Sequence, residues 1–129
     1  MKTYFLLFKF SLIWALLILI ACTCRVQTDI DGIDLDIPYL DKVVHFGMYL
    51  ILGALATFEF RRITKYYYKY IVKLLIICVL YGIFIEVVQY FLPWRGFEIE
   101  DMIADGLGAA AGIYGIKCLI FDKIVEKKN

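Results

Sequence analysis

The sequence has almost no net charge, a single histidine and no Cys-x-x-Cys pair. With 14 Lys and Arg residues against 13 Asp and Glu, its formal net charge is +1, so nothing indicates a nucleic-acid partner. One histidine and four scattered cysteines are too few ligands for a typical zinc site. We therefore expect no metal and no other cofactor. The 129 residues contain no internal repeat, no Pro- or Gly-rich linker and no low-complexity tail, which predicts one domain.

Apolar residues, in contrast, are abundant. The chain is 63% hydrophobic with a mean hydropathy of +0.77, against roughly 45–50% apolar residues in soluble domains. Four stretches, at about 4–21, 43–60, 71–92 and 102–121, approach the ~20 residues that a membrane-spanning helix needs. Because lipid requires each backbone group to be satisfied within the segment, we expect helices. We predict an all-α integral membrane bundle of four transmembrane helices, with antiparallel successive helices.

Charge is segregated between the connections of these spans. The first connection, residues 23–42, carries five aspartates, whereas all the charged residues of the second connection are basic. Because basic connections remain in the cytoplasm, both termini are predicted to be cytoplasmic. Residues 23–42 then form an acidic extracytoplasmic loop and residues 122–129 a basic cytoplasmic tail. Of the 14 Lys and Arg residues, only Arg25, Lys42 and Arg95 lie outside in this topology.

Residues 1–22 allow two interpretations. The apolar run is long enough for a first transmembrane helix, with Lys9 late for the start of a secretory signal. However, residues 19–22, Leu-Ile-Ala-Cys, are similar to the signal at which bacterial lipoproteins are cleaved and lipidated on cysteine. In both cases Cys22 is outside and the later spans keep their orientation.

Polar residues from separate spans share one predicted depth, close to the extracytoplasmic surface. Ionisable residues in or beside membrane spans are unfavourable, and this makes them candidates for function. We call this set the polar cluster, and its members are Asp41, Lys42, His45, Glu86, Gln89, Arg95, Asp101 and Asp105. The cluster is the predicted ligand-binding site.

Small residues follow one face of the last span. Gly108, Gly112 and Gly115 recur at helical spacing, and small residues allow helix backbones to approach closely. We predict that this stripe packs span four tightly, either within the bundle or in a homodimer.

Two motifs in the sequence resemble the VanZ-like family of small bacterial membrane proteins. The first motif is Asp41-Lys42-x-x-His45-Phe46-x-x-Tyr49, followed by Leu52-Gly53. The second is Glu86-x-x-Gln89-x-Phe91-x-Pro93-x-Arg95, followed by Asp101-x-x-Ala104-Asp105-x-x-Gly108. The family usually has Asn at the position of Asp105 and often Gly at that of Trp94.

The resemblance covers residues 41–115 and implies a VanZ-like domain at 41–121 with three transmembrane helices. It also implies a multi-pass protein of the bacterial cytoplasmic (inner) membrane. The family's founding member is associated with low-level resistance to teicoplanin, a glycopeptide that acts on cell-wall precursors. This implies a cell-envelope role that lowers glycopeptide susceptibility.

Three interpretations of the polar cluster remain open. In the first, Lys42, His45 and Arg95 hold the phosphate of an anionic phospholipid or a lipid-linked cell-wall precursor, while the acids and the amide orient other groups. In the second, the cluster residues only pair with one another, Arg95 with Asp101 or Glu86, and hold the helices in register.

The third interpretation is an intramembrane enzyme acting on a lipid-linked substrate. His45 would be the general base, with Glu86 or Asp105 as its partner; a metal-assisted version would add Asp41. Against it, no Ser or Cys lies at the outer ends of spans two to four as an obvious nucleophile.

Overall fold

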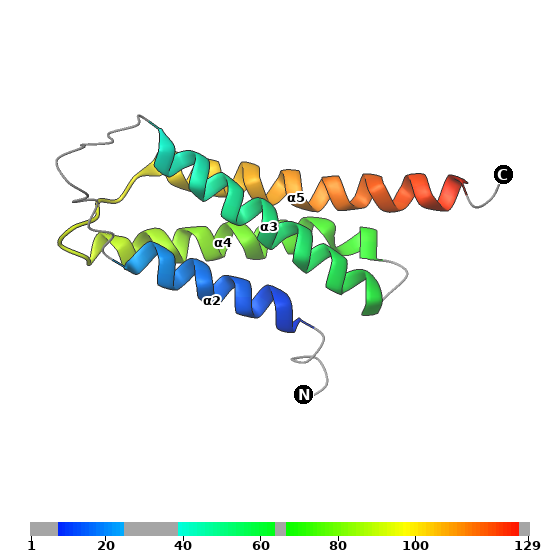
Figure 1. The fold of residues 1–129 in the computed structure, drawn as a ribbon, viewed down its shortest axis with the longest axis horizontal. Coiled ribbons are helices and arrows are strands. Elements are labelled where there is room, and N and C mark those ends of the chain that lie inside the picture. The colour runs from blue at the N-terminus through cyan, green and yellow to red at the C-terminus, as the bar shows by residue number, and fades with distance from the viewer. Residues whose placement is uncertain (1–7, 25–38, 64–66, 127–129) are drawn as a thin grey trace, which may run out of the picture.

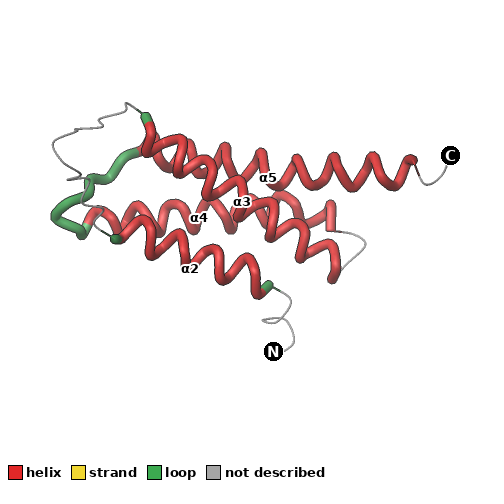
Figure 2. Tube along the Cα trace, in the orientation of Figure 1, coloured by secondary structure: helices red, strands yellow, loops and turns green. Residues whose placement is uncertain are grey.

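The computed structural model describes residues 8–24, 39–63 and 67–126. Within these ranges the secondary structure consists of helices joined by turns and loops, without a strand (Figures 1 and 2). The elements are α2 (Lys9–Thr23), α3 (Leu40–Ile63), the short 3-10 helix η1 (Tyr67–Tyr70), α4 (Ile71–Tyr90) and α5 (Ile99–Glu126). Most of the predicted acidic loop, residues 25–38, lies outside the described residues, as do residues 127–129 of the predicted tail.

Three of the helices are long and apolar enough to cross a membrane. These are Leu40–Ile63, Ile71–Tyr90 and Ile99–Leu119. The α2 helix is apolar but has only 15 residues, fewer than the ~20 that span a bilayer. The prediction of an all-α membrane protein is therefore confirmed, and three of the four predicted spans are long and apolar enough to cross a membrane.

The helix ends differ slightly from the predicted spans. The α4 helix ends at Tyr90, shortly before Pro93, because a proline disfavours helical conformation in the residue before it. The α5 helix begins at Ile99 and continues to Glu126, so it extends into the segment 122–129 that we predicted as a tail.

Successive helices run in opposite directions, and this places α3 and α5 parallel to each other (Figure 1). The most extensive contact in the bundle is between these two helices. Gly108 lies against the carbonyl oxygen of Phe46, and Gly112 lies against that of Leu50. A Cβ atom on either glycine would overlap the backbone of α3, so the close approach depends on the absence of a side chain.

Two members of the glycine stripe, Gly108 and Gly112, therefore pack within the chain. The contact ends before Gly115, which is exposed. A Cβ there would meet no described atom within 4 Å. Of the three glycines predicted to pack, only Gly108 and Gly112 lie against α3.

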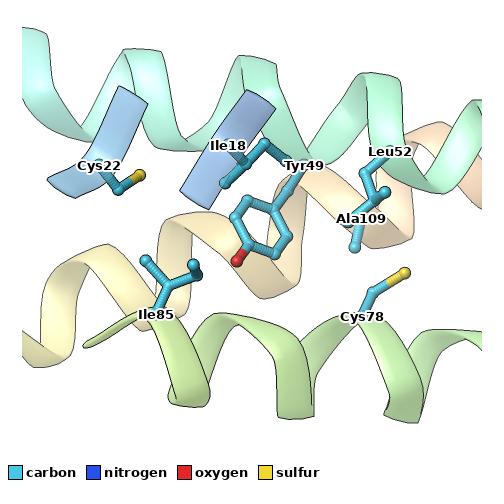
Figure 3. Packing of buried hydrophobic residues seen from close by; sticks show 7 residues of the cluster. All are labelled: Ile18, Cys22, Tyr49, Leu52, Cys78, Ile85 and Ala109. Carbon is cyan, nitrogen blue, oxygen red and sulfur yellow. The ribbon is translucent and has the colours of Figure 1, made fainter. Parts of the chain in front are cut away.

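A small apolar core joins the four α-helices. Its buried members are Ile18, Cys22, Tyr49, Leu52, Cys78, Ile85 and Ala109 (Figure 3). Many other apolar side chains of the same helices point outward. This exposure is expected where lipid, rather than protein, covers the helix surface.

Candidate functional site

All eight residues of the polar cluster lie at the end of the bundle where α3 and α5 begin and α4 ends. The parallel packing of α3 and α5 brings their first turns side by side (Figure 1). Because α4 runs the opposite way, its last turn and the following link reach the same end. Five members are almost completely buried, with exposed fractions of 0–3%: His45, Glu86, Gln89, Asp101 and Asp105.

His45 and Asp105 form the centre of the cluster. The Nδ1 nitrogen of His45 lies 3.0 Å from Oδ1 of Asp105. An ionised Asp105 carboxylate only accepts hydrogen bonds, and in that state the ring donates from Nδ1. Gly82 of α4 makes room for this carboxylate, because a Cβ there would lie 2.9 Å from Oδ2 of Asp105. The carboxylate thereby fixes the ring so that Nε2 points away from Asp105.

Nε2 of His45 faces Asp101, one turn before Asp105 on α5. The distance from Nε2 to Oδ2 of Asp101 is 3.9 Å, which is too long for a hydrogen bond. Neither Nε2 of His45 nor Oδ1 of Asp101 makes a hydrogen bond to any described residue. Asp41, one turn before His45 on α3, contributes a third group, and one ligand atom from each lies within 4.8 Å of the others.

The two basic residues of the cluster are each engaged by carboxylates. Nζ of Lys42 lies 2.8 Å from Glu98, 3.1 Å from Glu100 and 3.5 Å from Asp101. Arg95 donates from its guanidinium group to Oδ2 of Asp41 at 2.9 Å. Arg95 thus pairs with neither Asp101 nor Glu86, the two partners that the sequence suggested.

Glu86 and Gln89 of α4 connect helices. Oε2 of Glu86 accepts a hydrogen bond from the backbone N–H of Glu98 at 3.1 Å, just before the start of α5, where a negative charge also favours the helix dipole. The side-chain amide of Gln89 donates to the backbone carbonyl of Cys22 at 3.2 Å, so it joins α4 to the end of α2.

Carboxylates outnumber cations at this end of the molecule. Among the described residues there, two basic side chains, Lys42 and Arg95, face six acidic ones. The acidic residues are Asp41, Glu86, Glu98, Glu100, Asp101 and Asp105. Even with a protonated His45 the formal charge is negative, so the interior of the cluster is better suited to a cation than to an anion.

Sequence analysis missed Glu59, which is 2% exposed at the opposite end of α3. Its carboxylate accepts hydrogen bonds from the backbone N–H groups of Phe10 at 2.9 Å and Ser11 at 3.0 Å, and from the Ser11 hydroxyl. It therefore caps the first turn of α2 from another helix. The available signal was an acid inside a predicted span, which the rule for intramembrane charges marks as needing a partner.

These features define a class of protein: a helical membrane protein with a buried histidine–carboxylate cluster at one end of its spans. The VanZ/LLP1 family model matches residues 2–121. The chain belongs to this family, and the matched range includes α2 as well as the three longer helices. No curated protein matches the chain, and no solved structure does.

Proposed function

We propose that this chain is a multi-pass protein of the bacterial cytoplasmic membrane that binds or modulates a surface component through its polar cluster. The cluster would face the extracytoplasmic side, as the segregation of basic residues favours. The observation that carries the proposal is the convergence of polar residues from α3, α4, the following link and α5 at one end. Membrane proteins rarely retain so many ionisable groups at one depth without a use for them.

The edge of the cluster suits an anionic group such as a phosphate. The side chains of Lys42 and Arg95 are 23% and 30% exposed, so each can reach beyond the buried acids. Exposed ion pairs of this kind contribute only about 0–1 kcal/mol, and a phosphate could replace the present carboxylate partners. An anionic phospholipid and a lipid-linked cell-wall precursor both offer this chemistry, and binding the latter would link the cluster to glycopeptide susceptibility.

Teicoplanin susceptibility of a sensitive host tests this function. We expect the wild-type chain to raise the minimal inhibitory concentration, and His45→Ala and Arg95→Ala to return it to the level of the empty vector. Lys73→Ala is the matched control, because it removes a positive charge at the opposite end of α4. Membrane levels of all variants are equalised by immunoblot.

Two results would contradict the proposal in different ways. If the wild type gives no protection, the chain does not have the role associated with the family's founding member. If His45→Ala and Arg95→Ala protect as well as the wild type, the cluster only pairs its own charges and holds the helices in register.

A second candidate function is catalysis on a lipid-linked substrate, which the His45–Asp105 pair favours. A carboxylate that fixes the ring through Nδ1 leaves Nε2 available to accept a proton, as a general base requires. Turnover of such a substrate is expected to disappear in His45→Ala and to fall in Asp105→Asn. Turnover that survives His45→Ala would exclude this mechanism.

We also propose that α2 is retained in the mature protein rather than cleaved before Cys22. Cleavage there would remove the hydrogen-bond partners of two side chains and one backbone carbonyl. The Glu59 carboxylate would lose Phe10 and Ser11, and the Tyr81 hydroxyl would lose Ala15. The carbonyl oxygen of Met48 would lose the Trp14 ring that donates to it. The intact mass of the purified protein is expected to include residues 1–21, without a lipid on Cys22. A shorter, lipidated product would contradict retention.

A further inference from the structure

Three ligand atoms lie close together at the start of α3 and α5, one each from Asp41, His45 and Asp101. The atoms lie within 4.8 Å of one another. The separation of His45 Nε2 and Asp101 Oδ2, 3.9 Å, is shorter than two metal–ligand bonds of about 2.0–2.2 Å placed end to end. An ion between these atoms therefore needs only small side-chain adjustments.

His45 is oriented as metal-binding histidines are. Such a ring binds the ion through one nitrogen and donates the N–H of the other to a carboxylate or carbonyl group. Here Nδ1 bonds to Asp105 at 3.0 Å, while Nε2 is buried, directed at Asp101 and without a hydrogen bond to any described residue. A buried polar nitrogen without a partner is unfavourable, and an ion at Nε2 would remove this penalty.

We propose that Asp41, His45 and Asp101 bind a divalent transition-metal cation, with Asp105 as the positioning residue for His45. Sequence analysis expected no metal because the chain has a single histidine. The two carboxylate ligands come from different helices, α3 and α5, and the sequence does not show that they lie together. The excess of carboxylates over basic residues around the cluster favours a cation electrostatically. Asp41 is 42% exposed in its side chain, which gives an ion a path from solvent.

The ligand set indicates the kind of cation. Imidazole together with carboxylates suits Zn²⁺, Mn²⁺ and similar ions, whereas Ca²⁺ and Mg²⁺ prefer sites made of oxygen atoms alone. Lys42 lies 3.5 Å from Asp101 and Arg95 lies 2.9 Å from Asp41, so both basic residues compete with the ion for its ligands. This inference stands on the geometry of the three ligands and does not require the proposed function.

Metal binding to the purified full-length chain tests the site with the cations alone. The protein carries Cys24→Ser and Cys118→Ser, since these two exposed thiols could bind metal themselves. After treatment with a chelator, equilibrium dialysis against Zn²⁺ or Mn²⁺ is expected to give one ion per chain, and Co²⁺ a visible absorption spectrum. Mg²⁺ and Ca²⁺ at equal concentration are expected not to displace it.

The variants separate a metal site from a set of paired charges. His45→Ala and Asp101→Asn are expected to abolish the bound ion, and Asp105→Asn to weaken affinity about 10- to 100-fold. Asp41→Asn changes a partly exposed side chain, so weaker binding there cannot be attributed to misfolding. Glu100→Gln is the matched control, because it removes an exposed carboxylate of the same helix turn and is expected to retain the ion.

Lys42→Gln and Arg95→Gln distinguish this inference from the proposed function. Both are expected to bind the cation at least as tightly as the parent chain, because each removes a competing positive charge. An anionic ligand would instead be lost in both. Absence of a bound ion in the parent chain, or equal binding in parent, His45→Ala and Asp41→Asn, would overturn the metal site.

Discussion

Gly112→Val is expected to separate α3 from α5 and to destabilise the protein strongly. The new side chain would overlap the carbonyl group of Leu50 and the backbone nitrogen of Ala54. Backbone atoms in a helix cannot move aside as a flexible side chain can. Overpacking of a core costs about 1–3 kcal/mol where side chains can adjust, so we expect at least this loss here. The thermal unfolding midpoint of the purified protein measures this loss of stability. Size-exclusion chromatography of the same sample measures its oligomeric state.

Gly115→Val is the matched control for this prediction. It adds the same side chain one turn later on α5, at an exposed position where a Cβ meets no described atom within 4 Å, so stability is expected to change little. If the stripe formed a homodimer interface instead, Gly112→Val would convert a dimer to a monomer without unfolding it. That outcome, or equal effects of the two variants, would contradict the packing of α5 on α3.

Glu59→Ala is expected to release α2 from α3. The carboxylate of Glu59 accepts two backbone N–H groups and one hydroxyl at the start of α2, and its burial at 2% exposure leaves no water to replace it. Hydrogen bonds to charged groups contribute about 1.5–3 kcal/mol each, and loss of the acceptor exposes the unpaired donors of a helix N-terminus. Hydrogen exchange of the amides in residues 10–23 is expected to accelerate strongly, while α3 and α5 remain protected.

Two further variants, Glu59→Gln and Glu100→Gln, are the controls for this prediction. Glutamine at position 59 retains an acceptor without the charge, so an intermediate increase in exchange is expected. Glu100 is an exposed acid at the other end of the molecule, and its replacement is expected to leave α2 unchanged. Unaltered exchange of α2 in Glu59→Ala would show that this carboxylate does not hold the helix.

The helices, and the one end of the bundle that the polar residues share, could be predicted from the sequence because both depend on local patterns. Apolar length predicts a span, and the position of a residue within a span predicts its depth. His45, Glu86 and Asp105 were assigned to one end in this way, and they lie at one end in the structure. The family that the motifs suggested is confirmed by the match over residues 2–121.

The partners of these residues could not be predicted, because they depend on the register between α3 and α5. That register is set where Gly108 meets Phe46 and Gly112 meets Leu50, contacts between backbones that hydropathy does not encode. It places Arg95 beside Asp41 instead of Asp101 or Glu86. Glu59 was missed for a related reason, since its partners are backbone groups of another helix.

The side of the membrane that the polar cluster faces is the most direct test of the central claim, that the cluster meets a component outside the cell. Gly96→Cys and Arg62→Cys, in the Cys24→Ser, Cys118→Ser background, place exposed thiols beside the cluster and at the opposite end of α3. In intact cells, a membrane-impermeant maleimide is expected to label Gly96→Cys and to reach Arg62→Cys only after permeabilisation. Labelling of Arg62→Cys alone in intact cells would place the cluster in the cytoplasm and contradict its proposed role.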